Sequence, residues 1–174
     1  MKYFLTGGTG FVGGHVARQL LADGHDVVAL ARDPSAAGDL DAAGAEVVEG
    51  DVTERETLYD PMDGVDGVFH VAGWYEIGAA DPSVGERVNV DGTRNVLTVM
   101  DELDVPKGVY TSTLAVNSDT GGQVVDERYR YAGRHLTAYD RTKWEAHYEV
   151  AEPMVEAGLP LVTVMPGLVY GPGD

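Results

Sequence analysis

A tyrosine and a lysine stand four residues apart in the segment Tyr139-Asp140-Arg141-Thr142-Lys143. Residues four apart share one face of a helix, so the phenol and the ammonium would lie side by side. A phenol has an ordinary pKa of about 10, and its ionised form must be stabilised by roughly 4 kcal/mol before it can exchange protons near neutral pH. Lys143 and a second positive charge nearby would supply this stabilisation, which makes Tyr139 a candidate acid/base. A tyrosine and a lysine four residues apart also occur on ordinary solvated helix faces, so other features must support a catalytic role for Tyr139.

Hydroxyl side chains in Thr111-Ser112-Thr113 follow an apolar run that is typical of a strand. The carboxyl end of a parallel strand is the edge where doubly wound sheets bind ligands. A hydroxyl of Ser112 or Thr113 at that edge would hydrogen-bond a substrate oxygen while hydride moves. The alternative is that both residues only cap the strand end.

A glycine-rich segment, Thr6-Gly7-Gly8-Thr9-Gly10-Phe11-Val12-Gly13, comes directly after the first apolar run. A helix that opens here presents free N–H groups and its positive dipole end, and glycines let a pyrophosphate approach the backbone closely. The glycine spacing would also suit a tight turn between a strand and a helix. Its position at the first such junction favours a dinucleotide site.

The end of the second predicted strand discriminates between the two common dinucleotides. An acidic residue there would bind the ribose 2′-hydroxyl of NAD, whereas an arginine would accept the 2′-phosphate of NADP. Ala31 stands where the acid is expected, and Arg32 follows with a guanidinium suited to bidentate phosphate contact. The sequence favours NADP over NAD, although Arg32 could pair with a surface acid and Asp33 could still reach the ribose.

Short β-branched runs alternate with longer helical stretches, a pattern typical of a parallel sheet with helices on both faces. We predict an α/β fold with a doubly wound parallel (Rossmann) sheet, in one NAD(P)-binding domain over residues 1–174. The six strands are expected at Lys2 to Leu5, Asp26 to Leu30, Glu46 to Glu49, Gly67 to Val71, Gly108 to Thr111 and Leu161 to Met165.

Helices are expected between these strands. They are Phe11 to Ala22, one from near Pro34, one after Thr53, and two longer helices over Pro82 to Leu103 and Thr137 to Ala157. Val12, Val16 and Leu20 give the first helix an apolar face for the sheet.

The helix boundaries carry their own signals. Asp33 is the expected cap of the second helix, and Thr53-Glu54-Arg55-Glu56 reads as a capping box for the third. Pro153 is expected to disturb the last helix, because proline cannot donate a backbone hydrogen bond.

The chain of 174 residues has 12 Lys plus Arg against 29 Asp plus Glu, a formal net charge of -17, and no cysteine. Thiolate catalysis and disulfides are excluded, and so acidic a protein would be repelled by nucleic acid and by anionic membranes. Lysine occurs only at Lys2, Lys107 and Lys143, while acids are dispersed. This is typical of salt-loving microbes, where concentrated salt screens self-repulsion; an ordinary acidic surface is the alternative.

No apolar stretch approaches the roughly 20 residues of a membrane helix, and the apolar start is too short for a signal peptide. We expect a cytoplasmic protein. The histidines lack metal-ligand spacing, so no metal site is predicted; they are His15, His25, His70, His135 and His147. Trp74, Tyr75, Tyr129 and Tyr131 could contact substrate or simply pack.

Together these motifs resemble the extended short-chain dehydrogenase/reductases, also called the NAD-dependent epimerase/dehydratase family. The similarity covers the whole chain. It rests on the segments Thr6 to Gly13, Gly50-Asp51-Val52, His70-Val71-Ala72-Gly73, Asn89-Val90-Asp91-Gly92-Thr93, Tyr139 with Lys143, and Pro166 to Pro172. Ala29 to Pro34 and His70-Val71-Ala72 are most similar to the dihydroflavonol-reductase-like branch, which uses NADPH.

The resemblance implies roles for single residues. Tyr139 would be the acid/base, Lys143 would hold the ribose hydroxyls, and Thr113 matches the catalytic Ser/Thr better than Ser112, with a one-residue ambiguity. Asp51 and Val52 would contact the adenine, and Ala72 and Gly73 the nicotinamide ribose. The implied cofactor contacts are Gly7, Thr9, Gly10, Phe11, Val12, Gly13, Arg32, Asp51, Val52, Ala72, Gly73, Lys143 and Pro166.

Departures from the family narrow the expected chemistry. Leu114-Ala115 replaces the Asp-Glu pair of dehydratases, so sugar dehydration is not expected. Asn117-Ser118 replaces a usual tyrosine-glycine pair. Family members continue past Gly171-Pro172-Gly173 into a smaller C-terminal substrate-binding part, which we expect to be absent from a sequence that ends at Asp174.

Three functions are compatible with these residues. The first is an NADPH-dependent carbonyl reductase with Tyr139 as proton donor and Thr113 orienting the oxygen. The second is a nucleotide-sugar epimerase that retains NAD, and the third is a cofactor-binding module without turnover. The resemblance also implies a homodimer through the two long helices, whose residues Val84, Val88, Val96 and Met100 could serve core or interface.

Overall fold

Six parallel strands form the centre of the computed structural model, which describes residues 1–76, 81–126 and 128–174. The strands are β1 (Lys2–Thr6), β2 (Asp26–Ala31), β3 (Glu46–Glu49), β4 (Gly67–His70), β5 (Gly108–Thr111) and β6 (Leu161–Val164). They pair in the order β3-β2-β1-β4-β5-β6, and each neighbouring pair is parallel. The predicted doubly wound sheet is confirmed, with strand ends at most one residue from those expected.

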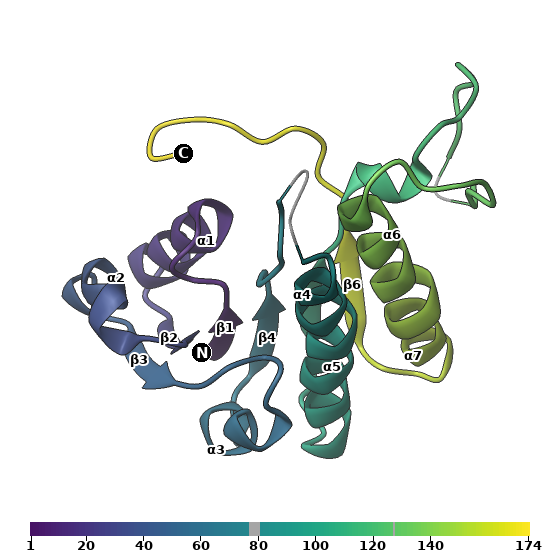
Figure 1. Cartoon of the computed structure of the whole chain (residues 1–174). Helices are drawn as coiled ribbons and strands as arrows, with labels where there is room; N and C mark the ends of the chain where they lie inside the picture. Colours follow the sequence, from purple (N-terminus) through teal and green to yellow (C-terminus); the bar gives the residue numbers. More distant parts are fainter. Residues whose placement is uncertain (77–80, 127) are drawn as a thin grey trace.

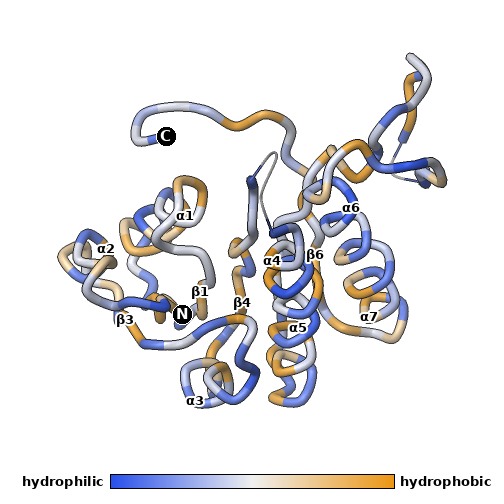
Figure 2. Tube along the Cα trace, in the orientation of Figure 1, coloured by the Kyte–Doolittle hydropathy of each residue, from blue (hydrophilic) through white to orange (hydrophobic). Residues whose placement is uncertain are grey.

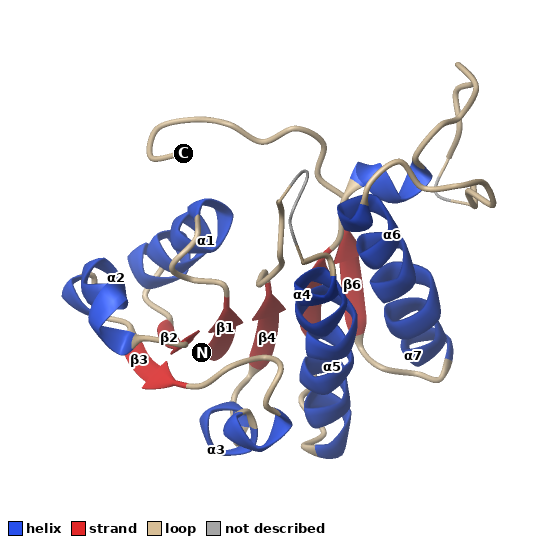
Figure 3. Ribbon diagram, viewed as in Figure 1, coloured by secondary structure: helices blue, strands red, loops and turns tan. Residues whose placement is uncertain are grey.

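Helices cover both faces of this sheet (Figures 1 and 3). The helices α1 (Phe11–Ala22) and α2 (Gly38–Ala42) lie against one face, and α3 (Tyr59–Met62) and two long helical columns lie against the other. Each face has its own apolar core, because successive strand residues point to opposite sides. Phe4 of β1 belongs to one core and Leu5 to the other.

The central strands are buried on both faces, as is usual for parallel sheets. β2 shows this most clearly, since every residue from Val27 to Ala31 is buried. Figure 2 shows the contrast with the helices, along which hydrophilic and hydrophobic residues alternate. The core therefore fixes the strand ends, and the loops after those ends carry the motifs singled out above.

The helix α1 has the predicted bounds, but its most buried side differs from the predicted one. Gly13, Gly14 and Ala17 are buried, whereas Val16 and Leu20 are only partly buried at the border of one core. Small residues let the helix backbone come close to the glycine loop, so the tightest contact is made by glycine and alanine and not by the valine and leucine side chains.

The expected cap of the second helix is confirmed. The Asp33 carboxylate accepts a hydrogen bond from the Ser35 N–H at 2.9 Å, and a 3-10 turn follows over Pro34–Ala37 before α2 begins. Asp33 thus satisfies a helix-start donor that would otherwise lack a partner.

The predicted capping box at Thr53 is wrong. The Thr53 hydroxyl and N–H both donate to the Asp51 carboxylate, at 2.9 and 2.8 Å, so an Asx turn forms two residues earlier. A short 3-10 turn over Arg55–Thr57 follows, whose start at Glu54 has no side-chain cap, and α3 begins only at Tyr59.

The two long predicted helices are present, each with a wider π-helical middle. The first column runs through α4 (Ser83–Gly85), a π-helical segment over Glu86–Asp91 and α5 (Gly92–Glu102). The second runs through α6 (Ala138–Glu145), a π-helical segment over Ala146–Ala151 and α7 (Glu152–Glu156). Pro153 lies in the first turn of α7, directly after the π-helical segment, a position where proline is tolerated. Since the first column has the same π-helical middle without a proline, the widening is not assigned to Pro153.

The apolar residues of the first column serve the interior. Val96 and Met100 are fully buried in the core, whereas Val84 and Val88 line the cleft described below. Among the described residues, no helix is both long enough and apolar enough to cross a bilayer.

Gly13 and Gly38 give a matched test of the close packing of α1. An added Cβ at Gly13 would lie 2.1 Å from the Gly7 carbonyl oxygen, whereas at Gly38, with a helical φ of −56°, it would meet nothing within 4 Å. We expect Gly13→Ala to lower the free energy of unfolding by about 1–3 kcal/mol and Gly38→Ala to raise it by about 0.4–1 kcal/mol. Urea denaturation measures both, and equal effects would contradict this account of the packing.

Candidate functional site

A cleft of about 960 Å³ runs along the carboxyl ends of the strands. One end is lined by the glycine loop and the end of β2, and the other by residues that follow β4, β5 and β6 and by the start of α6. Every residue predicted for the site lines this cleft: Gly7, Thr9, Gly10, Phe11, Val12, Gly13, Arg32, Asp51, Val52, Ala72, Gly73, Thr113, Tyr139, Lys143 and Pro166. The fold therefore brings together segments that are far apart in the sequence.

The glycine loop is built by close backbone contacts. Gly7 has a φ of +75°, and an added Cβ there would lie 2.6 Å from the Ala72 nitrogen. The Gly10 N–H donates to the Gly7 carbonyl at 3.0 Å, and α1 begins immediately afterwards with Gly10 as its cap residue. No side chain caps this helix start, so its first N–H groups and its positive dipole end are open to a diphosphate.

At the end of β2, Arg32 is exposed and lines the cleft. Its neighbour Asp33 is turned to Ser35, whose N–H and hydroxyl both donate to the same carboxylate oxygen, at 2.9 and 2.6 Å. Asp33 is not among the cleft-lining residues. The Arg32 guanidinium, and not the Asp33 carboxylate, is therefore the charged group that the end of β2 presents to the cleft.

Tyr139 lies in the first turn of α6, which Thr137 caps by accepting a hydrogen bond from the Asp140 N–H at 3.0 Å. Burial raises the pKa of Tyr139, and the nearby Thr113 hydroxyl acts in the opposite direction. The ring of Tyr75 meets that of Tyr139 edge-on, with centroids 4.8 Å apart. Tyr139, Thr113 and Tyr75 thus share one end of the cleft.

Lys143 is almost completely buried and turns its ammonium to β5. Nζ donates to the Thr111 carbonyl at 2.9 Å and to the Tyr110 phenol at 3.3 Å. Burial lowers the pKa of Lys143 to about 8. The sequence predicted a lysine beside Tyr139 but gave no sign of Tyr110 as its partner.

A buried polar chain continues from Tyr110 to the glycine loop, and sequence reasoning missed it. The Tyr110 ring stacks on the His70 ring, with centroids 5.6 Å apart, and the Thr93 hydroxyl lies 3.0 Å from His70 Nε2. His70 Nδ1 lies 2.7 Å from the hydroxyl of Thr6, the first residue of the glycine-rich segment. Burial, aided by the Lys143 charge, lowers the pKa of His70 to about 3, so the ring is neutral.

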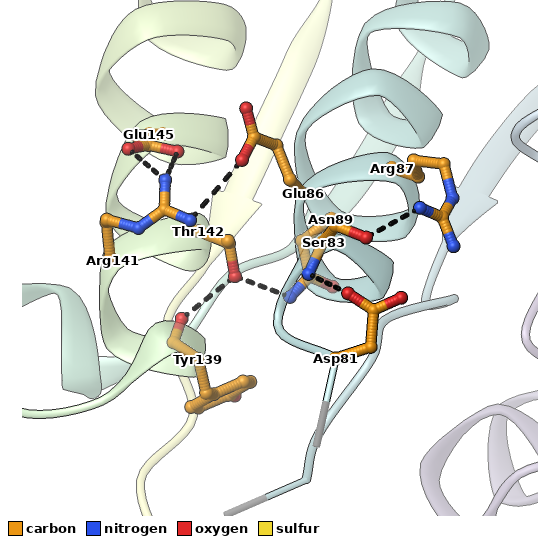
Figure 4. A network of polar contacts seen from close by, with 9 residues as sticks. All are labelled: Asp81, Ser83, Glu86, Arg87, Asn89, Tyr139, Arg141, Thr142 and Glu145. Atoms are coloured by element: carbon orange, nitrogen blue, oxygen red, sulfur yellow. Dashed lines mark hydrogen bonds and ion pairs between the residues drawn. The ribbon is translucent and has the colours of Figure 1, made fainter. Parts of the chain in front are cut away.

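Asn89 braces the loop after β4 against α6. Its amide group accepts from the Trp74 N–H at 2.7 Å and donates to the Trp74 carbonyl at 3.0 Å and to the Thr142 hydroxyl at 2.9 Å. Thr142 in turn donates to the Tyr139 carbonyl at 3.2 Å (Figure 4). One buried side chain therefore links the aromatic wall of the cleft to the turn that carries Tyr139.

Ion pairs surround this brace at the surface. Arg141 donates to Glu145 on its own helix at 2.7 Å and reaches Glu86 on the first column at 3.4 Å (Figure 4). Exposed pairs of this kind contribute little to stability, about 0–1 kcal/mol. The alignment of the two columns therefore depends more on the buried Asn89 and on their shared apolar core than on these ion pairs.

The other residues weighed from the sequence have structural contacts. The buried Ser112 hydroxyl lies 2.7 Å from His147 Nδ1, while Tyr129 and Tyr131 donate to carbonyl groups of their own loop. Ser118 has a φ of +44°, in the left-handed region that favours glycine, at the place where the resembling family has its usual glycine. Among the described residues, no group of three His, Cys, Asp or Glu side chains could hold a metal ion.

Comparison with known proteins defines the class of this chain. Residues 3–174 match the NAD dependent epimerase/dehydratase family. The chain belongs to this family, as the sequence motifs predicted.

Individual relatives agree with this assignment. The chain is 37% identical over 174 residues to a putative dihydroflavonol 4-reductase of Synechocystis, covering 99% of the chain and 50% of that protein. It is 34% identical over 175 residues to a farnesyl-dihydroquinoline-oxide ketoreductase of Stigmatella aurantiaca, covering 100% of the chain and 52% of the relative. The chain thus spans about half the length of these curated relatives.

A solved structure shows the same arrangement of strands and helices. The UDP-glucose 4-epimerase of Thermus thermophilus, in complex with NAD, superposes with a TM-score of 0.83 at 25% identity. The match covers 100% of this chain and 57% of that one.

Because the buried His70 ring is neutral, the free energy of unfolding depends on pH. Since the pKa of His70 falls from 6.5 to about 3 on folding, only the unfolded chain binds this proton between those pH values, and unfolding becomes easier as the pH falls. We expect His70→Gln to lose less stability than the wild type on acidification, by up to about 5 kcal/mol. Denaturant unfolding at stepwise lower pH measures this.

The exposed His15 provides the matched control, because it is a histidine on the surface of α1 and not in a buried site. His15→Gln should keep the acid sensitivity of the wild type. Identical acid sensitivity in all three proteins would show that His70 is not the group responsible.

Proposed function

We propose that this chain carries out the cofactor-binding and proton-transfer part of an NADP-dependent carbonyl reduction, or of the reverse alcohol oxidation. One observation carries the proposal: Tyr139, Thr113 and Lys143 meet at one end of a cleft whose other end is formed by the uncapped start of α1 and Arg32. Tight backbone packing at Gly7 and Gly13 leaves that start open to a diphosphate, so the residues present fit a dinucleotide.

The residues have separable roles in this proposal. The nicotinamide supplies a hydride acceptor or donor when it is bound. Tyr139 donates a proton to the carbonyl oxygen of the substrate, and the Thr113 hydroxyl orients that oxygen by a hydrogen bond. Lys143 places a positive charge near the phenol and the ribose, which favours the ionised phenol that remains after proton transfer.

The raised pKa of Tyr139 suits the direction of reduction. Burial keeps the phenol protonated in the isolated chain. The ammonium of Lys143, and the positive charge of an oxidised nicotinamide if one were bound, would lower the pKa of the phenol towards neutrality. A phenol that holds its proton before the reaction and releases it during the reaction is what a reductase requires.

Arg32 supports NADP, with NAD as the alternative. It is exposed at the end of β2 and lines the cleft, while Asp33 is held by Ser35. An arginine can bind a 2′-phosphate bidentately. The similar Thermus thermophilus epimerase binds NAD, which keeps the nucleotide-sugar epimerase as the second candidate.

The relatives named above as reductases support a small-molecule carbonyl substrate, and the epimerase supports a sugar. The homodimer, the cytoplasmic location and the salt-adapted surface stay predictions. No nucleic-acid or membrane partner is proposed for so acidic a chain.

Tyr139→Phe tests the proton-transfer role. With NADPH and a panel of ketones and aldehydes, we expect the loss of the Tyr139 hydroxyl to reduce turnover roughly 10²–10⁴-fold, the usual contribution of a positioned acid. Tyr131→Phe is the control, because its hydroxyl donates to the Arg134 carbonyl outside the cleft. NADPH oxidation at the same rate in both variants would overturn the role, and cofactor binding without any Tyr139-dependent turnover would favour the binding module.

Arg32→Ala tests the cofactor. Loss of a charge-assisted contact to the 2′-phosphate should weaken NADPH binding by roughly tenfold or more and leave NADH binding nearly unchanged. Fluorescence titration gives both affinities. Equal losses for the two cofactors, or tighter binding of NADH by the wild type, would contradict NADP as the cofactor.

A further inference from the structure

Lys143 is only 4% exposed, and a buried charge is expensive unless acceptors surround it. Two acceptors are present: the Thr111 carbonyl at 2.9 Å and the Tyr110 phenol oxygen at 3.3 Å. A lysine ammonium has three N–H donors. The third therefore remains for the cleft, which Lys143 lines.

One of the two acceptors belongs to the backbone and the other to a side chain. The Thr111 carbonyl is a backbone group that any residue at the end of β5 would provide. The Tyr110 phenol is a side-chain group, and its ring also faces the lysine, with Nζ 4.9 Å from the ring centroid. Phenylalanine at this position would keep the ring and lose only the acceptor.

The Tyr110 phenol is itself held in place from the other side. Its ring is fully buried and stacks on His70, with centroids 5.6 Å apart and planes 18° apart. His70 is in turn held by the Thr93 hydroxyl, 3.0 Å from Nε2, and by the Thr6 hydroxyl, 2.7 Å from Nδ1. Burial and the stack on a fixed His70 ring therefore keep the phenol oxygen next to Lys143.

The tautomer of His70 follows from Thr6. The Thr6 hydroxyl oxygen accepts the N–H groups of Val71 and Ala72, both at 3.2 Å, so its own proton is available for His70 Nδ1 at 2.7 Å. The remaining ring proton then sits on Nε2 and points to Thr93. This order of donors fixes the His70 ring, on which the Tyr110 ring stacks.

We propose that Tyr110 is a positioning residue for Lys143: its phenol oxygen accepts a hydrogen bond from the ammonium, fixes Nζ at the cleft wall and keeps it charged near neutral pH. The importance of this contact for catalysis rests on the proposed function, but the contact itself does not. The titratable groups around Lys143 are His70 from β4, Tyr110 from β5 and His147 from the second column, and Tyr139 lies one helical turn earlier on α6.

These neighbours provide no counter-charge. Burial holds the pKa of His70 at about 3 and that of His147 at about 4, so both rings are neutral at pH 7. Burial also raises the pKa of both tyrosines, which stay protonated. Lys143 must therefore remain charged through hydrogen bonds alone, and one of the two observed belongs to Tyr110.

The sequence has only three lysines, so the titration of Lys143 can be measured directly. In the full chain labelled with ε-¹³C lysine, the titrations of Lys2, Lys107 and Lys143 can be followed separately by NMR, with Lys143→Met to assign the resonance. Lys143 should titrate near pH 8 in the wild type. In Tyr110→Phe its midpoint should fall by roughly one to two pH units, because a hydrogen bond to a charged group is lost, while Lys2 and Lys107 keep theirs.

Tyr59→Phe is the matched control, since the Tyr59 hydroxyl donates to Glu102 at the surface. It should leave the Lys143 midpoint unchanged. An unchanged midpoint in a folded Tyr110→Phe protein would overturn the proposal. If the Tyr110→Phe variant does not fold, an NMR measurement on the wild type still tests the contact between Tyr110 and Lys143. A slowly exchanging Tyr110 hydroxyl proton close to the Lys143 ε-methylene supports the contact, and the absence of such a proton overturns it.

The Lys143 titration and the turnover assay distinguish failure of this inference from failure of the proposed function. Titration of Lys143 needs neither cofactor nor substrate. A shifted midpoint together with no Tyr139-dependent turnover would leave the Tyr110 contact standing and remove the reductase. Normal turnover with an unmoved midpoint would do the reverse.

Discussion

The site depends on one close approach, that between the glycine loop, the start of α1 and the chain leaving β4. A Cβ at Gly7 would lie 2.6 Å from the Ala72 nitrogen, and one at Gly13 would lie 2.1 Å from the Gly7 carbonyl. Any larger residue would push α1 away from the sheet edge. Because glycine alone allows this contact, the uncapped helix start faces the same cleft as the residues that follow β4 and β5.

Buried polar side chains then position the reactive groups at the other end. Asn89 ties the Trp74 backbone to Thr142, one residue before Lys143, and Tyr110 with Thr111 holds the lysine from the sheet. An unpaired buried polar group is costly, so such contacts allow few alternative arrangements. The cleft thus has a hydrogen-bonded wall on which Tyr139 and Thr113 are placed.

The strands and the ligand edge could be predicted because they follow from local patterns. Apolar runs, the glycine spacing and Asp33 before Pro34 each act within a few residues, and each was found as expected. The Thr53 capping box failed because Asp51, two residues earlier, competes for the same donors. The burial of Gly13 and Ala17 in place of Val16 was also missed, because close helix packing depends on the opposing loop.

The partners of the site residues could not be predicted for a similar reason. The buried polar chain consists of residues that are far apart in the sequence: Thr6, His70, Thr93 and Tyr110. Two residues in direct contact can lie 64 positions apart, as Thr6 and His70 do, and no periodicity connects them. Each alone reads as an ordinary strand or helix residue. Only the sheet order β1-β4-β5 places them in a line between the glycine loop and Lys143.

Binding of a dinucleotide at the start of α1 is the claim on which the rest is built. Titration of the ¹⁵N-labelled chain with NADPH, followed by the backbone amide resonances, tests it most directly. The account predicts saturable shifts that are largest at Gly10, Phe11, Val12 and Gly13. Largest shifts outside the cleft, or none at saturating NADPH, would contradict it.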